Sequence, residues 1–515
     1  MAVGPFFNEP VVDFRVEANA AAMRAAIEKV RGQLGREYDL IIDGRPGRTS
    51  EKIRSFNPAR PSEVIGVHQK AGREHVQPAM EAALAAFESW KKVPVQQRAD
   101  LLIRTADILR KRKPEFNAWM VLEVGKNWDE AEADTCEAID FCEFYARLAL
   151  RMDQAEPAVQ LPGERDTLRY IPLGVGAVIS PWNFPLAIMC GMTTAAVVSG
   201  NTVVLKPSSD SPTISAKFFE ALEEAGLPPG VVNFCPGSGA TFGNGLVEHP
   251  KTRFIAFTGS RDVGLDINLR AAQPRPGQIW IKRTILEMGG KDSIVVAADA
   301  DLDAAVEGVA VSAFGFQGQK CSACSRAIVD ASLYDRFLEK LQARVAQIRI
   351  GDPAENAPAG PVVNEGALKS ISNYIGVGAQ EGRVIAGGKR ATGEGYFVEP
   401  TVIADVAPMA RIAQEEIFGP VLAVIRARDF DDALAIANNT EYGLTGAVYT
   451  LSPQQMERAR NEFQAGNLYI NRKCTGAIVG AHPFGGFNMS GTDSKAGGAD
   501  YLYLFTQAKS IATKL

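Results

Sequence analysis

The sequence predicts an α/β protein built on parallel sheets, and three observations support that prediction. Beyond Tyr170, short apolar strands alternate with helices, which is the pattern of successive βαβ units. Polar or glycine-bearing turns directly follow several of these strands, and parallel sheets bind their ligands at that edge. The chain has 515 residues, which is too long for a single hydrophobic core, so we expect two or three domains.

The N-terminal third is predicted to be largely helical. Helices are expected over residues 12–34, 74–90, 97–121 and 130–151. The helix over 74–90 has the clearest pattern, because its apolar residues recur at three- and four-residue steps. Strands and turns are expected over 49–70. The polar segment 155–167, which contains prolines and a glycine, is predicted to leave the core as a hairpin or excursion.

The rest of the chain is predicted to hold two α/β units, the second beginning near Gly289. Strands are expected over residues 174–179, 202–205, 231–234, 254–257 and 294–296. Helices are expected over 186–199, 212–225 and 304–314, with a further helix opening at 237–239. The C-terminal segment 501–512 has a strand-like pattern and is a candidate to pair outside its own domain.

Composition and charge exclude several classes of protein. The net charge is −5 and acidic and basic residues are mixed along the chain, so we expect neither a nucleic-acid nor a membrane partner. No window reaches the roughly 18 uninterrupted apolar residues of a membrane span, and the N-terminus shows no secretory signal. The cysteines are scattered, which favours free thiols in a reducing compartment and therefore a cytoplasmic enzyme.

Three motifs supply the side chains that acyl chemistry needs. Cys321 follows Gly-Gln-Lys and is the candidate nucleophile. Glu287, in Leu-Glu-Met-Gly-Gly-Lys, is the candidate base. Asn183, in Pro-Trp-Asn-Phe-Pro, has a side-chain amide that can donate to an oxyanion. Each motif alone is a weak signal, since a lone cysteine is usually a small buried apolar residue, but the combination is specific.

Three further motifs suit a dinucleotide, and each also has a simpler interpretation. Lys206 ends a predicted strand and can hold ribose hydroxyls or phosphate, although a surface lysine can occupy such a position. Gly259, in Phe-Thr-Gly-Ser260, permits close backbone approach at a helix N-terminus, but an ordinary capping turn has the same pattern. Glu416 and Phe418 can contact a ribose and a planar ring, or can be a turn acid and a core aromatic.

Two other features have more than one interpretation. Cys321 and Cys324 form a Cys-x-x-Cys pair, which is compatible with redox chemistry or with zinc. Because there is no second pair and the histidines lack ligand spacing, we predict no metal site. The glycine-rich loop 485–491 either lines the mouth of an active site or links to the last strand.

The combined motifs carry a family resemblance. In chain order they are Asn183 in Pro-Trp-Asn-Phe-Pro, Lys206-Pro, Phe-Thr-Gly-Ser260, Glu287 in Leu-Glu-Met-Gly-Gly-Lys, Gly-Gln-Lys-Cys321, Glu416-Ile-Phe418-Gly-Pro and Pro-Phe-Gly-Gly-Phe. The chain resembles the aldehyde dehydrogenase superfamily over nearly its whole length. The resemblance implies that Cys321 attacks an aldehyde, and that Asn183 and the Cys321 N–H hold the oxyanion. It further implies hydride transfer to NAD(P)⁺ and water activation by Glu287.

The resemblance also implies cofactor contacts and a domain plan. The residues expected to bind the cofactor are Ser180, Pro181, Trp182, Lys206, Ser209, Gly237, Thr258, Gly259, Ser260, Glu416 and Phe418. The expected segments are an N-terminal extension at 1–40, a Rossmann-type cofactor domain at 41–152 and 171–288, a catalytic α/β domain at 289–485, and a small oligomerisation hairpin at 153–170 and 486–515. We therefore expect a homodimer or a higher homo-oligomer.

Narrower features resemble one branch of the superfamily, which oxidises glutamate 5-semialdehyde (1-pyrroline-5-carboxylate) to glutamate in proline catabolism. These features are the N-terminal extension, a serine directly after the catalytic cysteine, and the segment 471–477. The substrate of that branch has an α-carboxylate and an α-amine. The residues expected to bind it are Ser322, Gly476 and Ala477 at the carboxylate, and Phe184 and Phe484 beside the aliphatic chain.

The sequence alone leaves more than one cofactor and more than one substrate open. NAD-preferring members of the family commonly carry a glutamate three residues after the strand-end lysine, where this chain has Ser209. A hydroxyl does not repel a 2′-phosphate, so we expect NAD to be used and NADP to be accepted. Succinate or aminoadipate semialdehyde is the alternative substrate. A thioester-forming acyltransferase or a CoA-acylating dehydrogenase would share Cys321 without needing Glu287.

Overall fold

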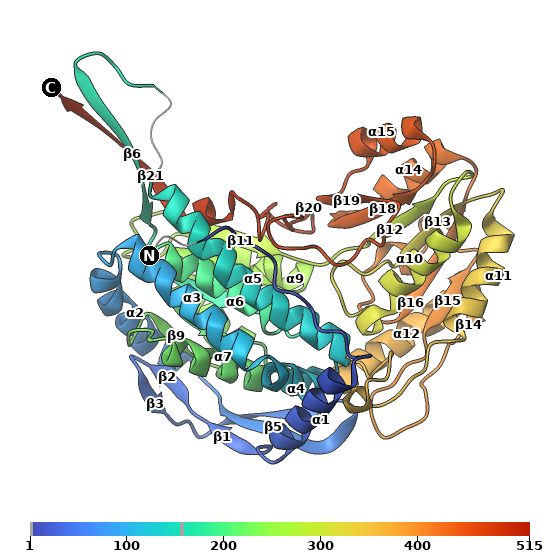
Figure 1. The fold of residues 1–515 in the computed structure, drawn as a ribbon, viewed down its shortest axis with the longest axis horizontal. Helices are drawn as coiled ribbons and strands as arrows, with labels where there is room; N and C mark the ends of the chain where they lie inside the picture. Colours follow the sequence, from blue (N-terminus) through green and yellow to red (C-terminus); the bar gives the residue numbers. More distant parts are fainter. Residues whose placement is uncertain (1–3, 155–158) are drawn as a thin grey trace.

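The protein consists of two lobes, each built around a seven-stranded sheet, as the computed structural model shows for residues 4–154 and 159–515 (Figure 1). In the first lobe the strand order is β11-β10-β7-β8-β9-β2-β3, and the strands from β7 to β11 are parallel. These strands are β2 (Leu40–Ile42), β3 (Arg45–Gly47), β7 (Val175–Ile179), β8 (Thr202–Lys206), β9 (Val232–Phe234), β10 (Phe254–Thr258) and β11 (Arg283–Glu287). The predicted parallel sheet is therefore confirmed.

Helices cover the first sheet and account for most of the N-terminal third. They are α1 (Glu17–Arg31), α2 (Val76–Trp90), α3 (Val95–Lys111), α4 (Lys113–Val124), α5 (Trp128–Met152), α6 (Ala187–Val198), α7 (Pro212–Glu224), α8 (Asn244–Glu248) and α9 (Arg261–Ala272). A separate three-stranded sheet joins β1 (Arg36–Tyr38), β5 (Arg60–Gln69) and β4 (Lys52–Asn57).

Two of the predicted helices were wrong in extent. The single helix expected over 97–121 is two helices that meet at Arg112, because Pro114 belongs in a first helical turn and disrupts a helix interior. The helix expected from residue 12 begins only at Glu17. Before it the chain is extended and donates backbone hydrogen bonds from Glu9 to Asp140 and from Val12 to Glu132, both on α5.

The second lobe has the sheet order β14-β15-β16-β13-β12-β18-β19. Its strands are β12 (Ser293–Val296), β13 (Arg326–Asp330), β14 (Arg383–Ala386), β15 (Thr401–Ala404), β16 (Val421–Ala427), β18 (Thr445–Tyr449) and β19 (Asn467–Ile470). Its helices are α10 (Leu302–Phe314), α11 (Tyr334–Val345), α12 (Glu365–Glu381), α13 (Arg411–Gln414), α14 (Phe430–Asn438) and α15 (Pro453–Glu462). The predicted second α/β unit is confirmed, with α10 beginning at Leu302.

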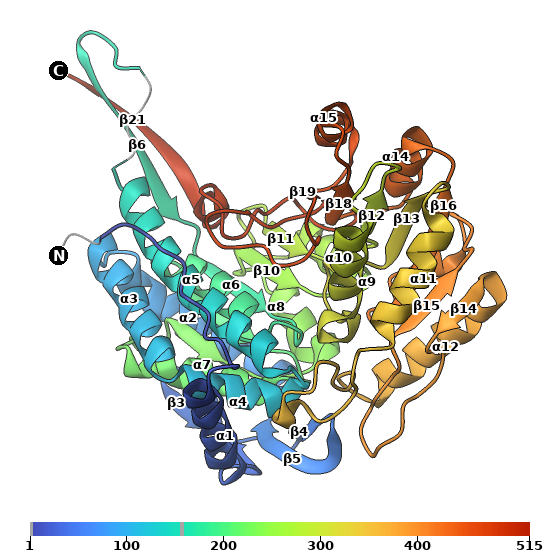
Figure 2. The same cartoon turned by 45° about the vertical axis from the view of Figure 1, so that its right-hand side comes forward.

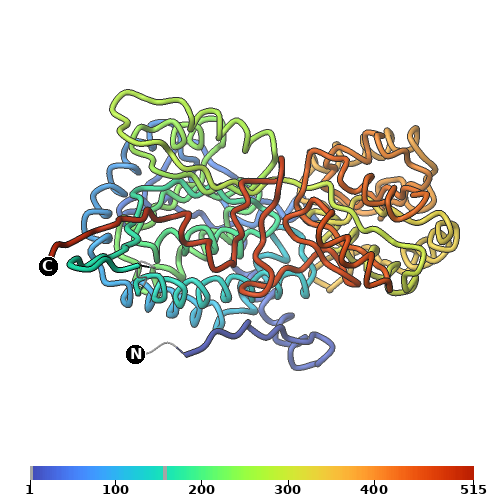
Figure 3. The backbone as a smooth tube through the Cα atoms, turned by 90° about the horizontal axis from the view of Figure 1, so that it is seen from above, coloured from blue at the N-terminus to red at the C-terminus, as the bar shows by residue number. Residues whose placement is uncertain are grey.

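The C-terminal chain leaves the second lobe and returns to the first (Figure 3). On the way, β20 (Phe487–Asn488) pairs with β17 (Tyr442–Gly443). Then β21 (Thr506–Lys514) pairs antiparallel with β6 (Glu164–Pro172), and the two strands project as an arm (Figures 1 and 2). Of the hairpin predicted over 155–167, residues 155–158 lie outside the described residues.

The strand predicted over 501–512 was wrong at its start. Residues Tyr501–Phe505 form a 3-10 helix, and only the residues from Thr506 onward form a strand. Tyr501 stacks on Tyr145 with ring centroids 5.4 Å apart, and Phe505 meets Phe254 edge to face at 5.4 Å. Burial of these rings against the first lobe outweighs the strand-like pattern of the segment.

The register of the first sheet positions the predicted site residues. Ile179 on β7 is paired with Lys206 on β8, and Thr258 on β10 is paired with Glu287 on β11. The carboxyl ends of these parallel strands therefore lie at one edge, where strand-end residues share a cavity with Cys321, Glu416 and Phe418 of the second lobe. No helix of the described residues combines the length and the apolar composition needed to cross a membrane.

Candidate active site

Cys321 belongs to the second lobe and follows a tightly wound turn after α10. Phe316, Gln317 and Gly318 have left-handed φ angles of 48°, 54° and 64°. The glycine is required at the third position, because a Cβ there would collide with the carbonyl of Gly419. Such backbone conformations are costly for other residues and gather at functional sites. The turn directs the half-buried Cys321 towards the edge of the first sheet.

Two cavities meet at this cysteine. The narrow chamber, of about 120 Å³, lies on one side, and the wide chamber, of about 540 Å³, lies on the other. Cys321 and Thr258 line both cavities. The sulfur can therefore be reached by two different molecules at once.

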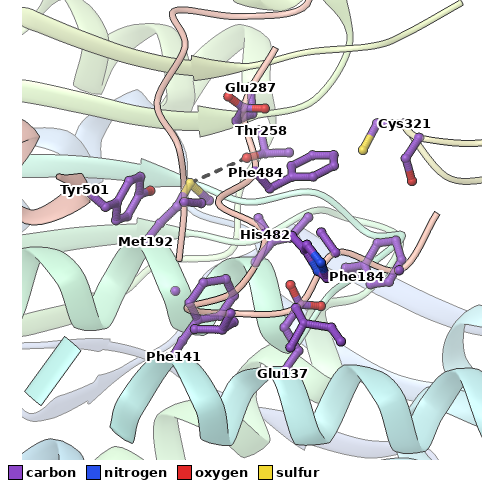
Figure 4. A pocket seen from close by; sticks show the side chains of 18 residues that line it. Glu137, Phe141, Phe184, Met192, Thr258, Glu287, Cys321, His482, Phe484 and Tyr501 are labelled. Atoms are coloured by element: carbon purple, nitrogen blue, oxygen red, sulfur yellow. Dashed lines mark hydrogen bonds between the residues drawn. The ribbon is translucent and has the colours of Figure 1, made fainter. Parts of the chain in front are cut away.

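The narrow chamber gathers the residues predicted to bind the substrate, together with the candidate base (Figure 4). Its predicted members are Phe184, Thr258, Glu287, Cys321, Ser322, Gly476, Ala477 and Phe484. Its other walls are mainly apolar and include Phe141, Ile188, Met192, Val479 and Tyr501. A small molecule with an aliphatic chain suits this lining.

The wide chamber gathers almost all of the residues predicted to bind a cofactor. They are Ser180, Pro181, Trp182, Lys206, Ser209, Thr258, Gly259, Ser260, Glu416 and Phe418, and Asn183 lines the same cavity. Gly237 does not line it. A Cβ on Gly237 would lie 2.7 Å from the carbonyl oxygen of Ala71, so the glycine permits close backbone packing. Its carbonyl accepts a hydrogen bond of 3.2 Å from Lys206 Nζ, so Gly237 contacts the chamber only through that lysine.

Glu287 is held by a loop that comes from the C-terminal chain. Its Oε1 accepts a hydrogen bond of 2.6 Å from the Ser494 hydroxyl, while its Oε2 is buried without a partner. Residues Ser490 and Thr492 of that loop bond to the backbone of Met288 and Leu286 on either side of the glutamate. Burial raises the pKa of Glu287 to about 8, although the hydrogen bond from Ser494 lowers it. A carboxyl group with that pKa acts as a base in its ionised form, whose share grows as the pH rises towards and above 8.

The thiol of Cys321 is in an environment that favours its neutral form. Burial raises the pKa of Cys321, and the nearby carboxylates of Asp292, Glu287 and Glu416 raise it further. Asn183 is buried, and its Nδ2 donates a hydrogen bond of 3.2 Å to the carbonyl of Gln319. An amide nitrogen has two N–H groups, so one remains available next to the cysteine.

Lys206 and Glu416 bring opposite charges to the wide chamber. Burial lowers the pKa of Lys206 to about 8, and its ammonium donates to the carbonyls of Pro207 (2.8 Å) and Gly237 (3.2 Å). Burial raises the pKa of Glu416 to about 7. Glu416 accepts a hydrogen bond of 3.2 Å from Gly290 N, and a Cβ on Gly289 would collide with this carboxylate. Gly289 therefore makes room for this carboxylate, and Gly290 donates to it.

Sequence reasoning missed several residues that the fold brings to these chambers. Glu137 and His482 line the narrow chamber, and Asp210 lines the wide chamber beside Ser209. Burial raises the pKa of Glu137 to about 8. The one available signal was the acidic spacing on α5, where Glu130, Asp134 and Glu137 share a helix face that is otherwise buried. Nothing local distinguishes Ser494, which lies in a polar loop.

Cys324 is turned away from the site. Its buried Sγ donates to the carbonyl of Arg326 at 3.4 Å. Within residues 4–154 and 159–515, no group of three or more His, Cys, Asp and Glu side chains is arranged to hold a metal ion. The predicted lack of a metal stays a prediction.

Comparisons with known proteins agree with this geometry. Residues 46–511 match the aldehyde dehydrogenase family. A 1-pyrroline-5-carboxylate dehydrogenase of Geobacillus thermodenitrificans is 58% identical over 511 residues, 99% of each chain, and one of Geobacillus kaustophilus is 57% identical over the same share. A solved 1-pyrroline-5-carboxylate dehydrogenase from Thermus with bound NAD has a TM-score of 0.98 and 52% identity, covering 100% of both chains. The predicted fold class is thereby confirmed, and the chain belongs to the aldehyde dehydrogenase family.

Proposed function

We propose that this protein oxidises L-glutamate 5-semialdehyde, derived from 1-pyrroline-5-carboxylate, to L-glutamate with NAD(P)⁺. The observation that carries the proposal is the position of Cys321 at the meeting point of the two chambers. An aldehyde in the narrow chamber and a cofactor in the wide chamber would both lie next to Cys321. The names of the relatives, and the NAD bound in the Thermus structure, support the choice of substrate and cofactor.

In the first half of the reaction, the Cys321 thiol, whose neutral form its surroundings favour, loses its proton to solvent and adds to the aldehyde carbon as the thiolate. The second N–H of Asn183 and the backbone N–H of Cys321 hold the oxyanion that forms. Gln319 fixes the amide through its 3.2 Å hydrogen bond, so little reorganisation is needed during addition. Bound NAD⁺ supplies the acceptor for the hydride that leaves this carbon, and Cys321 is left as a thioester.

In the second half, Glu287 removes a proton from the water that attacks the thioester. This releases the carboxylic acid and leaves Cys321 as the thiolate. Its pKa of about 8 makes the ionised Glu287 a stronger base than an ordinary carboxylate, and Glu287 then returns the proton to solvent. A general base of this kind contributes about 10²- to 10⁴-fold to the rate.

The far end of the narrow chamber suits an amino acid headgroup. We assign the substrate α-carboxylate to the Ser322 hydroxyl and to the N–H groups of Gly476 and Ala477. Glu137 lines the same chamber and offers a carboxylate to the α-amine. Because burial raises the pKa of Glu137 to about 8, an ammonium partner would favour its charged form.

The wide chamber fits a dinucleotide by the chemistry of its donors. The buried hydroxyl of Ser180 has no hydrogen-bond partner, and the Lys206 ammonium bonds only to backbone carbonyls. Lys206 would hold the adenosine ribose, Ser260 the pyrophosphate and Glu416 the nicotinamide ribose. Phe418 would lie by the nicotinamide, and Trp182 meets its ring edge to face at 5.6 Å. NADP is accepted in this proposal because Ser209 carries no charge.

We also propose that the protein is a cytoplasmic homo-oligomer. All seven cysteines are free thiols, which suits a reducing compartment. The β6–β21 arm extends from the body (Figure 1), α9 exposes Leu265 and Leu269, and the segment after α9 exposes Ile279 and Ile281. Exposed strand edges and apolar side chains of this kind are commonly covered by a second subunit.

The function is tested by NADH formation with a panel of aldehydes. Glutamate 5-semialdehyde is expected to give a kcat/KM at least about tenfold above succinate or aminoadipate semialdehyde, because one missing or displaced charged contact costs about 1.4 kcal/mol or more. The panel is repeated with CoA present. A higher rate with succinate semialdehyde, or product release that requires CoA, would contradict the proposal.

A further inference from the structure

A lysine with no exposed surface lies directly behind the aromatic wall of the narrow chamber. Lys126 follows Gly125, whose left-handed φ of 72° ends α4. Its side chain is 0% exposed, and its Nζ lies 2.8 Å from Oδ2 of Asp134, which is also 0% exposed. Burying two charges costs free energy that their attraction does not always recover, and apolar residues often serve stability equally well. A role beyond stability is therefore worth seeking.

The Lys126 ammonium is placed between two aromatic rings from different lobes. It lies 4.0 Å from the ring centroid of Phe184 and 4.9 Å from that of Phe316. Phe184 is half-buried and lines the narrow chamber, whereas Lys126 does not line it. The ammonium therefore contacts the ring of a chamber-lining residue without lining the chamber itself. Phe316 is in the left-handed turn that leads to Cys321.

Asp134 connects this lysine to the backbone that carries Phe184. Its Oδ1 accepts a hydrogen bond of 2.6 Å from Ala187 N, the first residue of α6. Phe184 lies three residues earlier in the same loop. One buried ion pair thus fixes both the backbone after Phe184 and the face of its ring, while also contacting the turn before the nucleophile.

We propose that Lys126 is a positioning residue that sets the orientation of Phe184 relative to Cys321. A cation held against a ring face restrains the tilt of the ring, and the attraction is strongest where water is excluded. The aliphatic chain of the substrate then lies against a wall whose distance from the sulfur is set by the Phe316 turn. This proposal rests on the proposed aldehyde oxidation, in which Phe184 contacts that chain.

Two other carboxylates near Lys126 give its loss a second way to change catalytic activity. Glu130 and Glu137 lie on the same face of α5 as Asp134, and Lys126 favours the charged form of each. Loss of Lys126 could therefore act through Glu137 on the substrate amine. An aldehyde without an amine separates the two routes, because only the effect through Phe184 would remain.

The test is a double-mutant cycle between Lys126→Met and Phe184→Leu, read as kcat/KM. Every protein that carries Lys126→Met also carries Asp134→Asn, so both charges of the buried pair are removed together, and the asparagine keeps an acceptor for Ala187 N. Two aldehydes are compared: glutamate 5-semialdehyde and pentanal, which has the same chain length but no headgroup. Thermal unfolding of every variant is measured alongside. Lys126→Arg, which keeps a cation, is the conservative variant and is expected to retain most activity.

Each single substitution is expected to lower kcat/KM about tenfold for both aldehydes. The double substitution should lower kcat/KM little further, because the effects of two residues that act as a unit are not additive. The matched control is the cycle of Lys126→Met with Phe484→Leu, whose ring has no contact with Lys126, and it should be additive. Additive effects with Phe184, or unchanged kcat/KM with only a lower Tm, would overturn the proposal. If pentanal is turned over but the semialdehyde is not, the proposed substrate is wrong. The coupling between Lys126 and Phe184 can then still be measured with pentanal.

Discussion

The hydroxyl of Ser494 donates a 2.6 Å hydrogen bond to Oε1 of Glu287, although the two residues are 207 positions apart in the chain. Ser494 is buried, and its loop also pairs with the backbone beside Glu287 through Ser490 and Thr492. The other oxygen of the glutamate has no partner. This arrangement fixes one carboxylate oxygen and leaves the second for water.

Ser494→Ala is expected to shift the pH dependence of turnover. The Glu287 base works when it is deprotonated, so deacylation should rise with pH through its pKa of about 8. The Ser494 hydrogen bond lowers that pKa, and its removal should move the rising limb to higher pH. The measurement is steady-state kcat from pH 6 to 10. Ser494→Thr keeps the hydroxyl and should keep the native profile; an identical shift in both variants would exclude the hydrogen bond as the cause.

Glu287→Gln should separate the two halves of the reaction. The glutamine still accepts from Ser494 but cannot take a proton, so we expect steady-state turnover to fall by about 10²- to 10⁴-fold. A first burst of NADH, of about one equivalent per site, should remain, because the base acts after hydride transfer. Stopped-flow absorbance at 340 nm measures both phases. Loss of the burst together with turnover would mean that Glu287 is needed earlier.

Cys321→Ala should abolish aldehyde oxidation, whereas Cys324→Ala should leave most of it. Cys321 lines both chambers, but the Cys324 sulfur is buried and bonded to the Arg326 carbonyl. The cost of Cys324→Ala is expected to appear as a lower Tm, since removing a buried sulfur costs on the order of 1 kcal/mol. NADH formation and thermal unfolding are measured on both proteins. Equal losses of activity would refute the assignment.

Ser209→Glu should weaken NADP⁺ selectively. Ser209 lines the wide chamber near Lys206, and a carboxylate there would repel a 2′-phosphate while still accepting from a 2′-hydroxyl. We expect kcat/KM for NADP⁺ to fall at least about tenfold, which corresponds to a repulsion of about 1.4 kcal/mol. The value for NAD⁺ should change little. Ser208→Glu, at the neighbouring lining position, is the control; the same loss there would show that any added charge suffices.

Removal of residues 508–515 should disrupt assembly. It deletes most of β21 and leaves β6 without its partner, while it spares the contacts of Thr506 and Gln507 with Arg283 and Arg253. Sedimentation analysis of the native protein is expected to show an oligomer and of the truncated protein a smaller species. Glu457→Ala, an exposed change on α15, is the control. A native protein that sediments as a monomer at micromolar concentration would refute the homo-oligomer.

Much of the candidate site could be predicted because its chemistry restricts residue types over short stretches. A nucleophile after Gly-Gln-Lys, a carboxylate beside paired glycines and a lysine at a strand end are local patterns. Parallel strands place their carboxyl ends together, so Asn183, Lys206 and Ser260, which follow predicted strands, were expected at one edge, and all three line the wide chamber. Gly237 packs against Ala71 and does not line the wide chamber, and its role in cofactor binding stays a prediction.

The amino-acid sequence by itself determined the strand and helix order, the family and the candidate nucleophile, base and amide, because these follow from local periodicity and from motifs of a few residues. Only the tertiary structure decided that Glu137 lines the narrow chamber, that Ser494 holds Glu287, and that Lys126 lies between rings from two lobes. Those contacts join segments far apart in the chain. Their geometry depends on how helices and lobes dock, and docking is set by the sum of many small packing contacts rather than by any local signal.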